Sequence, residues 1–418
     1  MFLEATTIMS ERIKVYDPRE QSKVKYPLVP TLFAMIIAWI AGCTSAVKIE
    51  TFWEEHFDQL KLWIPNFPDR YISHDTVNRL LSLIAVNDLK GLMSDFCQLV
   101  LDNAVSGEMD NVKRVLSLDG QTPRALEYEA KPDKHGNKSN DRRNINNRLY
   151  YVTLYDSTSG LSLAMERVQD KENENQACVR AVQMFDLTGT IVTADALNTQ
   201  RSVAEAIINR GGDYVLALKN NHKAIVEAVV NAISSPLLLD TYGSAYRTDV
   251  EIDHGRIERR TVIALPVSVI PNRKILKAWN KDCKTVFYAV TESAYQKYDV
   301  KREPEQRLFL SSLSNDHPDI AKLGYRAIRD HWKIENHLHW VLDMDFGQDH
   351  MQIKNRNYID NAELLSRLAL NVIKMLQPSM KVRKRQELPS ISSIIDKIKC
   401  NPGKHILKIA NALAYGKL

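Results

Sequence analysis

Cysteine is scarce in this chain of 418 residues, and no two cysteines stand close together. The five that it has lie far apart, and none belongs to a C-x-x-C pair: Cys43, Cys97, Cys178, Cys283 and Cys400. An odd number of scattered thiols is not typical of a disulfide framework or of a cysteine-based zinc site. The sequence therefore predicts reduced thiols in a cytoplasmic protein.

Long apolar runs are lacking as well. The most apolar one covers residues 32–43 and follows two prolines, Pro27 and Pro30. A membrane-spanning helix needs about 20 apolar residues, so this run predicts a buried helix of a soluble domain. Acidic residues such as Glu4 and Glu11 interrupt the N-terminus, so no signal peptide is expected. With 15 Gly, 15 Pro and no repeated unit, collagen-like and solenoid folds are poor fits.

A strong excess of charge of one sign is also absent. The 56 Lys and Arg against 51 Asp and Glu leave a net charge of +5, which permits a polyanionic partner without requiring one. The charge is unevenly placed, however. Residues 131–148 hold six basic against two acidic side chains, and residues 374–408 hold nine against two. These two segments are predicted to face nucleic-acid phosphate.

The order of apolar patterns indicates three parts. Residues 1–108 read as a small all-α domain, with DNA-end binding or oligomerisation as its expected role. Residues 109–373 alternate buried strands with helices, which predicts an α/β domain with parallel central strands and a β-rich insertion at about 240–318. Residues 374–418 read as a basic helical tail. The fold class is therefore α/β with helical additions at both ends.

Two acids follow buried strands of the α/β part. Asp119 and Asp195 each stand where an apolar strand ends, and ligand sites of open α/β sheets form at such ends. A carboxylate there is costly to bury unless it is paired or binds a metal. The alternative is an Asp that simply forms a turn.

A third acid lies in a histidine-rich helical stretch. Glu335 stands four residues from both His331 and His339, so an α-helix would place all three on one face. A solvated polar face is the alternative. Four histidines within residues 331–350 leave a zinc site open, but H-E-x-x-H is absent, and the i, i+2 spacing of His337 and His339 suits a strand better than a helix.

Three carboxylates without thiolates favour a hard cation, Mg²⁺ or Mn²⁺. Two such ions can activate a water and stabilise the leaving oxygen of a phosphodiester. Neither a G-x-S-x-G elbow nor a Walker loop is present to suggest other chemistry.

Several stretches together give the sequence a family resemblance. They are Tyr26-Pro-Leu with Ala41-Gly42, Leu118-Asp-Gly, Asp170-Lys-Glu-Asn-Glu, Thr193-Ala-Asp-Ala-Leu, Gly212-Asp-Tyr-Val-Leu-Ala-Leu-Lys-Asn-Asn, His254-Gly-Arg-Ile-Glu and His331-Trp-Lys-Ile-Glu-Asn-His-Leu-His-Trp-Val-Leu-Asp. With them, residues 26–374 resemble a DDE transposase of the IS4-like superfamily, most closely the ISAs1 group that includes the H-repeat-associated proteins.

The resemblance implies an RNase H-like catalytic core with a β-rich insertion between its second and third acids. By motif match, Asp119, Asp195 and Glu335 would be the catalytic acids and would bind two Mg²⁺ or Mn²⁺ ions. The implied reaction is cleavage at transposon ends and transfer of the freed 3′-hydroxyl into target DNA. The implied partners are double-stranded DNA, as terminal inverted repeats and as target, and a second copy in a homodimeric synaptic complex. No membrane partner is expected. The expected location is the bacterial cytoplasm, where the protein would associate with the nucleoid when it binds DNA.

The chain departs from the family pattern at a few places. Gln121 stands where Lys is usual, His222 where Gln is usual, and Ile328, His331 and Leu342 where the wider superfamily often has Tyr, Arg and Lys. The predicted DNA contacts are Lys219, Asn221, Arg142, Arg143, Arg256, Arg260, His331, Trp332 and His339. Trp332 and Trp340 would either stack on bases or belong to the core.

Two other functions remain open at this stage. A domesticated protein could keep the fold and bind DNA without mobilising any element. A simple metal-dependent nuclease could cut DNA without joining it.

Overall fold

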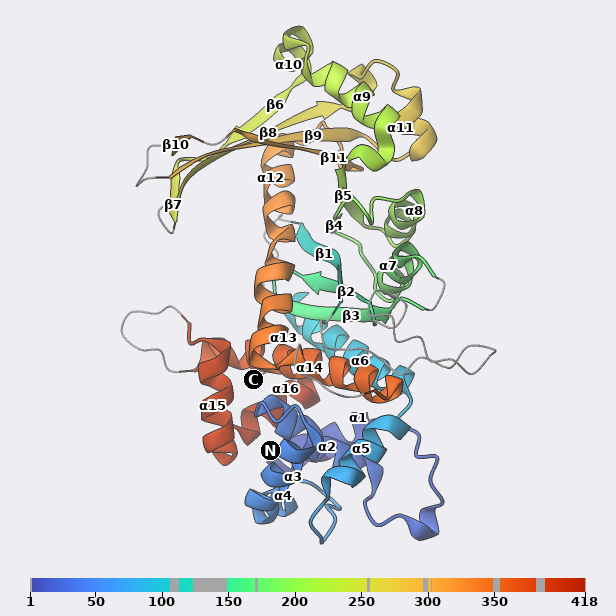
Figure 1. Ribbon diagram of the computed structural model, residues 1–418, viewed down its shortest axis with the longest axis vertical. Helices are drawn as coiled ribbons and strands as arrows, with labels where there is room; N and C mark the ends of the chain where they lie inside the picture. The colour runs from blue at the N-terminus through green and yellow to red at the C-terminus, as the bar shows by residue number, and fades with distance from the viewer. Residues whose placement is uncertain are drawn as a thin grey trace, which may run out of the picture.

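The structure is a computed structural model that describes residues 2–105, 113–122, 149–169, 172–253, 256–295, 300–301, 303–348, 354–380 and 388–417. Figure 1 shows an elongated molecule with a helical body at one end, an α/β part in the middle and a β-rich part at the other end. All five cysteines are free thiols, as the sequence predicts.

The helical body is built from both ends of the chain. Its N-terminal helices are α1 (Phe2–Arg12), α2 (Leu28–Ile40), α3 (Ala46–Glu55), α4 (Phe57–Trp63), α5 (His74–Leu83) and α6 (Val86–Val105). Its C-terminal helices are α14 (Arg356–Leu376), α15 (Ile391–Cys400) and α16 (Ile406–Tyr415). Helix α16 packs on α1, and α14 packs on α2, α5 and α6. The tail is therefore helical, and its last helix closes the N-terminal bundle (Figure 1).

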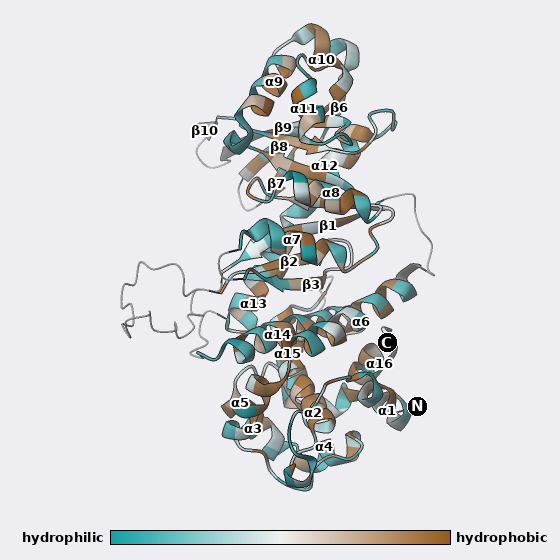
Figure 2. Ribbon diagram, turned by 90° about the vertical axis from the view of Figure 1, so that its right-hand side faces the viewer, coloured by the Kyte–Doolittle hydropathy of each residue, from teal (hydrophilic) through white to brown (hydrophobic). Residues whose placement is uncertain are grey.

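Helix α2 is the apolar run that the sequence singles out. It is buried along almost its whole length, and Figure 2 shows it mostly brown, the colour of hydrophobic residues. Trp39 on this helix donates to the hydroxyl of Ser366 on α14 at 2.9 Å. Gly42 follows Ala41, the C-cap residue of α2; it has a φ of +76° and would place a Cβ 2.5 Å from Ile395 of α15. Glycine is required there both by the left-handed backbone and by the close approach of α15.

No single helix in the described part of the chain has the length and apolarity to cross a membrane, although the bent pair Asn220–Ile233 and Pro236–Tyr242 passes the same test of length and composition.

The described strands form one mixed sheet. In the middle part they are β1 (Arg114–Gln121), β2 (Tyr151–Asp156), β3 (Leu161–Arg167), β4 (Thr190–Ala194) and β5 (Asp213–Leu218). The β-rich part adds β6 (Ser244–Arg247), β7 (Glu251–Asp253), β8 (Arg256–Pro266), β9 (Thr285–Tyr295), β10 (Val300–Lys301) and β11 (Glu305–Ser311). The main path runs β3-β2-β1-β4-β5-β11-β9-β8-β6, with β1, β4 and β5 mutually parallel.

The predicted mixed α/β fold with parallel central strands is thus confirmed. The insertion does not form a layer of its own, because β11 pairs antiparallel with β5 and extends the same sheet. Helices α9 (Lys223–Ile233), α10 (Pro236–Tyr242) and α11 (Lys274–Trp279) lie at the far end of this extension (Figure 1).

Helices cover both faces of the central strands. Figure 1 shows α7 (Glu174–Gln183) and α8 (Arg201–Asn209) on one side and the long helix α12 (Ile320–His331) on the other. Helix α12 contacts β1 and β4 as well as β6 and β8, so it runs along the junction of core and insertion. It leads through a wider helical turn into α13 (Trp340–Asp345), beside the helical body.

Candidate active site

The site begins at the carboxyl ends of the three parallel strands. Leu118 pairs with Ala194, and Ala194 pairs with Leu216, so the residues that follow stand level with one another at one sheet edge. Asp119 therefore lies beside Asp195 there. Lys219 follows directly after β5, so the same edge also carries a basic side chain.

Glu335 reaches this edge from an irregular helix. Residues Glu335–His339 form a π-helix between α12 and α13, so the regular α-helical spacing predicted for His331, Glu335 and His339 is wrong. A π-turn inserts extra residues into the helical repeat and shifts the side chains that follow it. His331 and Glu335 line the site, whereas His339 comes to lie against Asp119.

These side chains surround one cavity of about 730 Å³. It is lined by Asp119, Asp195, Ala196, Leu197, Ala217, Leu218, Lys219, Asn220, Asn221, Val226, Gln306, Arg307, Leu308, Phe309, Ile328, His331, Trp332 and Glu335. Strand ends, the insertion strand β11 and the end of α12 all contribute. The cavity therefore forms where core and insertion meet.

Two acids of this cavity, Asp119 and Glu335, have raised pKa values. Burial raises the pKa of Asp119 to about 7, and the nearby charges of Asp195, Glu335 and Glu174 act in the same direction. Burial also raises the pKa of Glu335, against the lowering effect of the Arg307 guanidinium. Such a cluster favours either protons or a bound cation.

The donor chemistry of this cluster fits a divalent metal ion. Oxygen ligands from carboxylates suit Mg²⁺ or Mn²⁺, and a cation would relieve the repulsion that raises the pKa of Asp119. Across the ranges that the structure describes, however, no three His, Cys, Asp or Glu side chains are already arranged to hold an ion. Neither the three predicted acids nor the described histidines of the alternative zinc site form such a group. The fourth histidine of that zinc site, His350, lies outside the described residues.

The histidines predicted to contact DNA have different surroundings. His331 shares a hydrogen bond of 3.0 Å between its Nδ1 and the Thr193 hydroxyl, and burial lowers its pKa to about 4. His339 has a side chain only 12% exposed, with Nδ1 3.7 Å from Oδ2 of Asp119. Burial lowers the pKa of His339 to about 3. This placement favours support of Asp119 over the predicted contact of His339 with DNA.

The other predicted DNA contacts divide into three groups. Lys219, Asn221 and Trp332 line the cavity, and the Asn221 amide donates to the Ala196 carbonyl at 2.8 Å, which ties two strand-end loops together. Arg260 instead forms ion pairs with Glu251 and Glu258 on the insertion sheet, so it is not free for phosphate as predicted.

The third group consists of predicted DNA contacts whose side chains the structure does not describe. Arg142 and Arg143 belong to the residues that the structure does not describe, and for Arg256 only the backbone, in β8, is described. Trp340, the other tryptophan considered for stacking, is 58% exposed and so does not belong to the core.

Two residues of the site were missed by sequence reasoning. Arg307 of β11 stacks its guanidinium over the Trp332 ring, 4.7 Å from the centroid, and lines the cavity. No sequence signal links two residues 25 positions apart on different elements. Glu174, at the start of α7, stands in a stretch that carries the family resemblance, but an acid in the first turn of a helix is too common to mark a site.

Comparison with known proteins assigns the family. A family model described as a transposase DDE domain matches residues 110–372, and a second, described as associated with it, matches residues 13–97. The chain belongs to the DDE transposases. It is of the IS4-like, ISAs1 type that the motifs predict, since its relatives include H repeat-associated proteins.

The similar proteins match this transposase over most of its length. YbfL of Escherichia coli K12 is 27% identical over 89% of this chain and 91% of its own length. YhhI of the same strain, H repeat-associated by name, is 26% identical over the same shares. Among solved structures, the piggyBac transposase synaptic complex with hairpin DNA is similar at a TM-score of 0.38 and 10% identity, covering 97% of this chain and 78% of that one.

Proposed function

We propose that this transposase cuts DNA at the ends of its element and joins the freed 3′-hydroxyl to target DNA. The observation that carries the proposal is the single cavity where Asp119, Asp195 and Glu335 meet basic and aromatic side chains. The carboxylates suit divalent metal ions, and the basic side chains suit DNA phosphate. The cavity therefore offers groups for metal binding and for substrate binding in a phosphodiester reaction.

Asp119, Asp195 and Glu335 would hold two divalent ions in an RNase H-like core. The strand order β3-β2-β1-β4-β5, antiparallel at first and then parallel, supports that fold. Bound ions supply a more acidic attacking water or hydroxyl and stabilise charge on the leaving oxygen. The neighbouring His339 lies with Nδ1 3.7 Å from Oδ2 of Asp119, and its low pKa leaves the imidazole neutral, so that it does not compete with the ions as a cation.

The DNA would enter across the mouth of the cavity. Lys219, directly after β5, stands beside Arg307 of the paired strand β11, and together the two cations can bind phosphate next to the scissile bond. Trp332 offers an aromatic face whose position is fixed by Arg307. We further propose that two copies assemble to bring both element ends together, in the bacterial cytoplasm.

The test is a cleavage and strand-transfer assay on the DNA that flanks the gene, searched for terminal inverted repeats. Asp119→Asn should lower both activities by about 10³-fold or more, since metal-held charge stabilisation is worth several kcal/mol. Asp58→Asn, which changes an exposed acid on α4, is the matched control and should keep full activity.

The same assay separates the two alternatives. Cutting without joining, and without preference for the inverted repeats, would identify a simple nuclease. Specific binding without Mg²⁺-dependent cutting would identify a domesticated DNA-binding protein. Strand transfer that survives in Asp119→Asn would overturn the proposal.

A further inference from the structure

Lys374 lies in the last turn of α14 and begins the basic segment 374–408, which the sequence predicts to face DNA phosphate. Its ammonium points inward instead. It donates to the Tyr155 hydroxyl at 3.1 Å, to the Gly160 carbonyl at 2.8 Å and to the His337 carbonyl at 2.9 Å. Lys374 therefore uses all three of its donors on three segments of the chain: strand β2, the turn that follows it and the π-helix.

The partners of this ammonium are all neutral. Among the residues that the structure describes, no Asp or Glu forms an ion pair with Lys374, and burial alone lowers its pKa to about 7. The ring of Tyr155 lies 5.0 Å from the Nζ of Lys374 and adds a cation–π contact. A largely buried cation without an acid is costly, so an apolar side chain would fill this space at lower cost. The lysine therefore has a task that depends on its hydrogen bonds.

The His337 carbonyl belongs to the wide turn that carries Glu335. The π-helix closes with a bond from the Trp340 N–H to the Glu335 carbonyl, five residues back. Helical turns of this width are rare and occur mostly singly, often at functional sites. A charged donor forms a stronger bond to a carbonyl than a neutral backbone N–H does. Lys374 thus stabilises the wide turn from outside.

The turn between β2 and β3 gives the ammonium a fixed support. The Asp156 carboxylate accepts from the Ser159 hydroxyl at 2.6 Å, which holds this turn together. The same turn also binds the helix before the π-helix, because the Ser157 hydroxyl donates to the Asp330 carbonyl of α12 at 2.9 Å. The chain is therefore held to one turn both before and after Glu335.

Gly160 in this turn leaves room for the lysine stem. It has a φ of +76°, and a Cβ at this position would lie 3.3 Å from Cδ of Lys374 and 3.6 Å from the Tyr155 hydroxyl. A larger residue would press on the stem and strain the backbone. The turn and the lysine therefore fit closely.

We propose that Lys374 is a positioning residue for Glu335: it binds the His337 carbonyl and so holds the π-helix in the geometry that places Glu335 at the cavity. The inference deepens the proposed function and rests on it for the task of Glu335 as a metal-holding acid. It gives α14 of the helical body a part in the active site, although no described residue of that helix lines the cavity.

Hydrogen exchange of the full-length, metal-free protein, followed by mass spectrometry, tests the contact itself. Lys374→Met keeps the size of the stem but removes the donors. The peptide that covers residues 335–342 should then exchange about 10-fold faster, because a charge-assisted hydrogen bond to the π-helix is lost. Lys90→Met is the matched control, since Lys90 also joins distant segments by binding Glu166 of β3 at 2.6 Å. Unchanged exchange of this peptide in Lys374→Met, or an equal rise in both variants, overturns the inference.

The Mg²⁺ requirement of cleavage separates positioning from stability alone. Lys374→Met should raise the Mg²⁺ concentration for half-maximal cleavage by about 10-fold or more, as the loss of a support behind a metal ligand does. Lys90→Met should leave this concentration unchanged. Faster exchange in Lys374→Met with a normal Mg²⁺ requirement would leave the lysine a purely structural role and would also overturn the inference.

A milder pair of variants serves if Lys374→Met does not fold. Gly160→Ala places a methyl group against the Lys374 stem. Gly189→Ala introduces the same left-handed strain, at a φ of +74°, with nothing within 4 Å of the new Cβ. The π-helix should exchange faster in Gly160→Ala alone, and equal exchange in the two variants contradicts the inference.

The two proposals can fail separately. If the wild type transfers no strand but Lys374→Met still loosens the π-helix, the contact made by Lys374 stands and the proposed reaction is rejected. If strand transfer depends on Asp119 while Lys374→Met changes neither the exchange nor the Mg²⁺ requirement, only the role of Lys374 is rejected.

Discussion

Gly120 sets the distance between the catalytic strand and the side chains behind it. A Cβ at this position would lie 2.1 Å from the Tyr150 hydroxyl and 2.5 Å from Glu174. Gly120→Ala should therefore lower the free energy of unfolding by about 1–3 kcal/mol, because the tightly held neighbours must shift. Gly91→Ala is the control, since nothing lies within 4 Å of a Cβ in that helix position. It should be neutral or stabilise by up to about 1 kcal/mol.

The free energy of unfolding of both glycine variants is measured by chemical denaturation, and strand transfer is measured on the same samples. Gly120→Ala should lose activity even at temperatures where it is folded, because Asp119 moves with its neighbour. Equal stability of the two variants would show that the contact behind Gly120 is not close in solution.

Asp119 makes the stability of the metal-free protein depend on pH. Its folded pKa of about 7 lies above the ordinary value of 3.8, so the native state holds a proton that the unfolded chain has lost. The contribution of Asp119 to the free energy of unfolding should therefore fall as pH rises from about 4 to about 7, by up to about 4 kcal/mol for three pKa units. The lowered pKa values of His331 and His339 act in the opposite direction up to about pH 6.5, so the effect of Asp119 is the difference between the wild type and Asp119→Asn.

Denaturation curves at pH 5 and pH 8 check this prediction. Asp119→Asn should show a smaller fall because it carries no titrating group at that position. Saturating Mg²⁺ should also reduce the fall in the wild type, since a bound cation replaces the proton. A metal-free wild type that gains as much stability as Asp119→Asn over this pH range, or more, would contradict the sign.

The sequence predicts some residues of the site better than others. Asp119 and Asp195 could be found because a buried strand that ends in an acid is a local pattern, and parallel strands bring their ends together. Glu335 was found by its motif, although the face it occupies depends on a π-turn. Arg307 could not be found, because its stacking on Trp332 depends on how β11 lies across α12.

At the scale of elements, local sequence patterns predict that a helix or strand is present, but not which other elements it pairs with or packs against. The buried helix α2, the hairpin of β2 and β3, and the parallel strands all follow from runs of apolar residues. The junction of β11 with β5 does not, because any free strand edge offers the same backbone groups. The π-helix is equally hidden, since it arises from the packing of α12 and α13 rather than from residue propensity.

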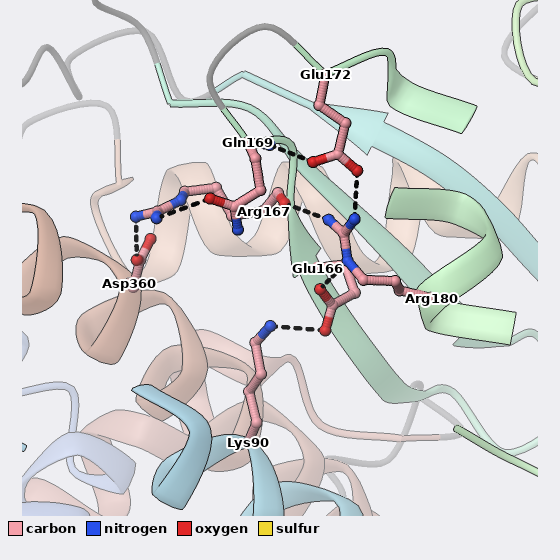
Figure 3. A network of polar contacts seen from close by, with 7 residues as sticks. All are labelled: Lys90, Glu166, Arg167, Gln169, Glu172, Arg180 and Asp360. Atoms are coloured by element: carbon pink, nitrogen blue, oxygen red, sulfur yellow. Dashed lines mark hydrogen bonds and ion pairs between the residues drawn. The ribbon is translucent and has the colours of Figure 1, made fainter. Parts of the chain in front are cut away.

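The network of Figure 3 links α6 and α14 of the helical body to β3 and α7 of the α/β part. Glu166 of β3 accepts from Lys90 of α6 and from Arg180 of α7, and its side chain is only 9% exposed. Glu166→Gln should lower the free energy of unfolding by about 1–3 kcal/mol, because two charge-assisted hydrogen bonds weaken together.

Glu205→Gln provides the comparison, because its ion pair with Arg201 is exposed on both sides. This change should cost no more than about 0.5 kcal/mol. Equal effects in the two variants would mean that the network contributes nothing beyond a surface pair.

At the scale of the whole molecule, the position of the basic tail matters more than the net charge of +5. Helix α15 packs against α13, which continues from the π-helix of the site, so this part of the tail lies on the side of the helical body that adjoins α13 (Figure 1). Lys397 and Lys399 are exposed on α15. We expect them to bind phosphates of DNA that leaves the active site.

The salt dependence of DNA binding tests this arrangement. The double variant Lys397→Gln, Lys399→Gln should weaken binding and lower the slope of log affinity against log salt by about 2, since each lost phosphate contact removes about 0.9. Lys274→Gln with Lys281→Gln removes the same charge near α11, at the far end of the insertion, and should leave the slope unchanged. An equal fall in both double variants would mean that only total charge counts, and that the tail has no defined place on the DNA.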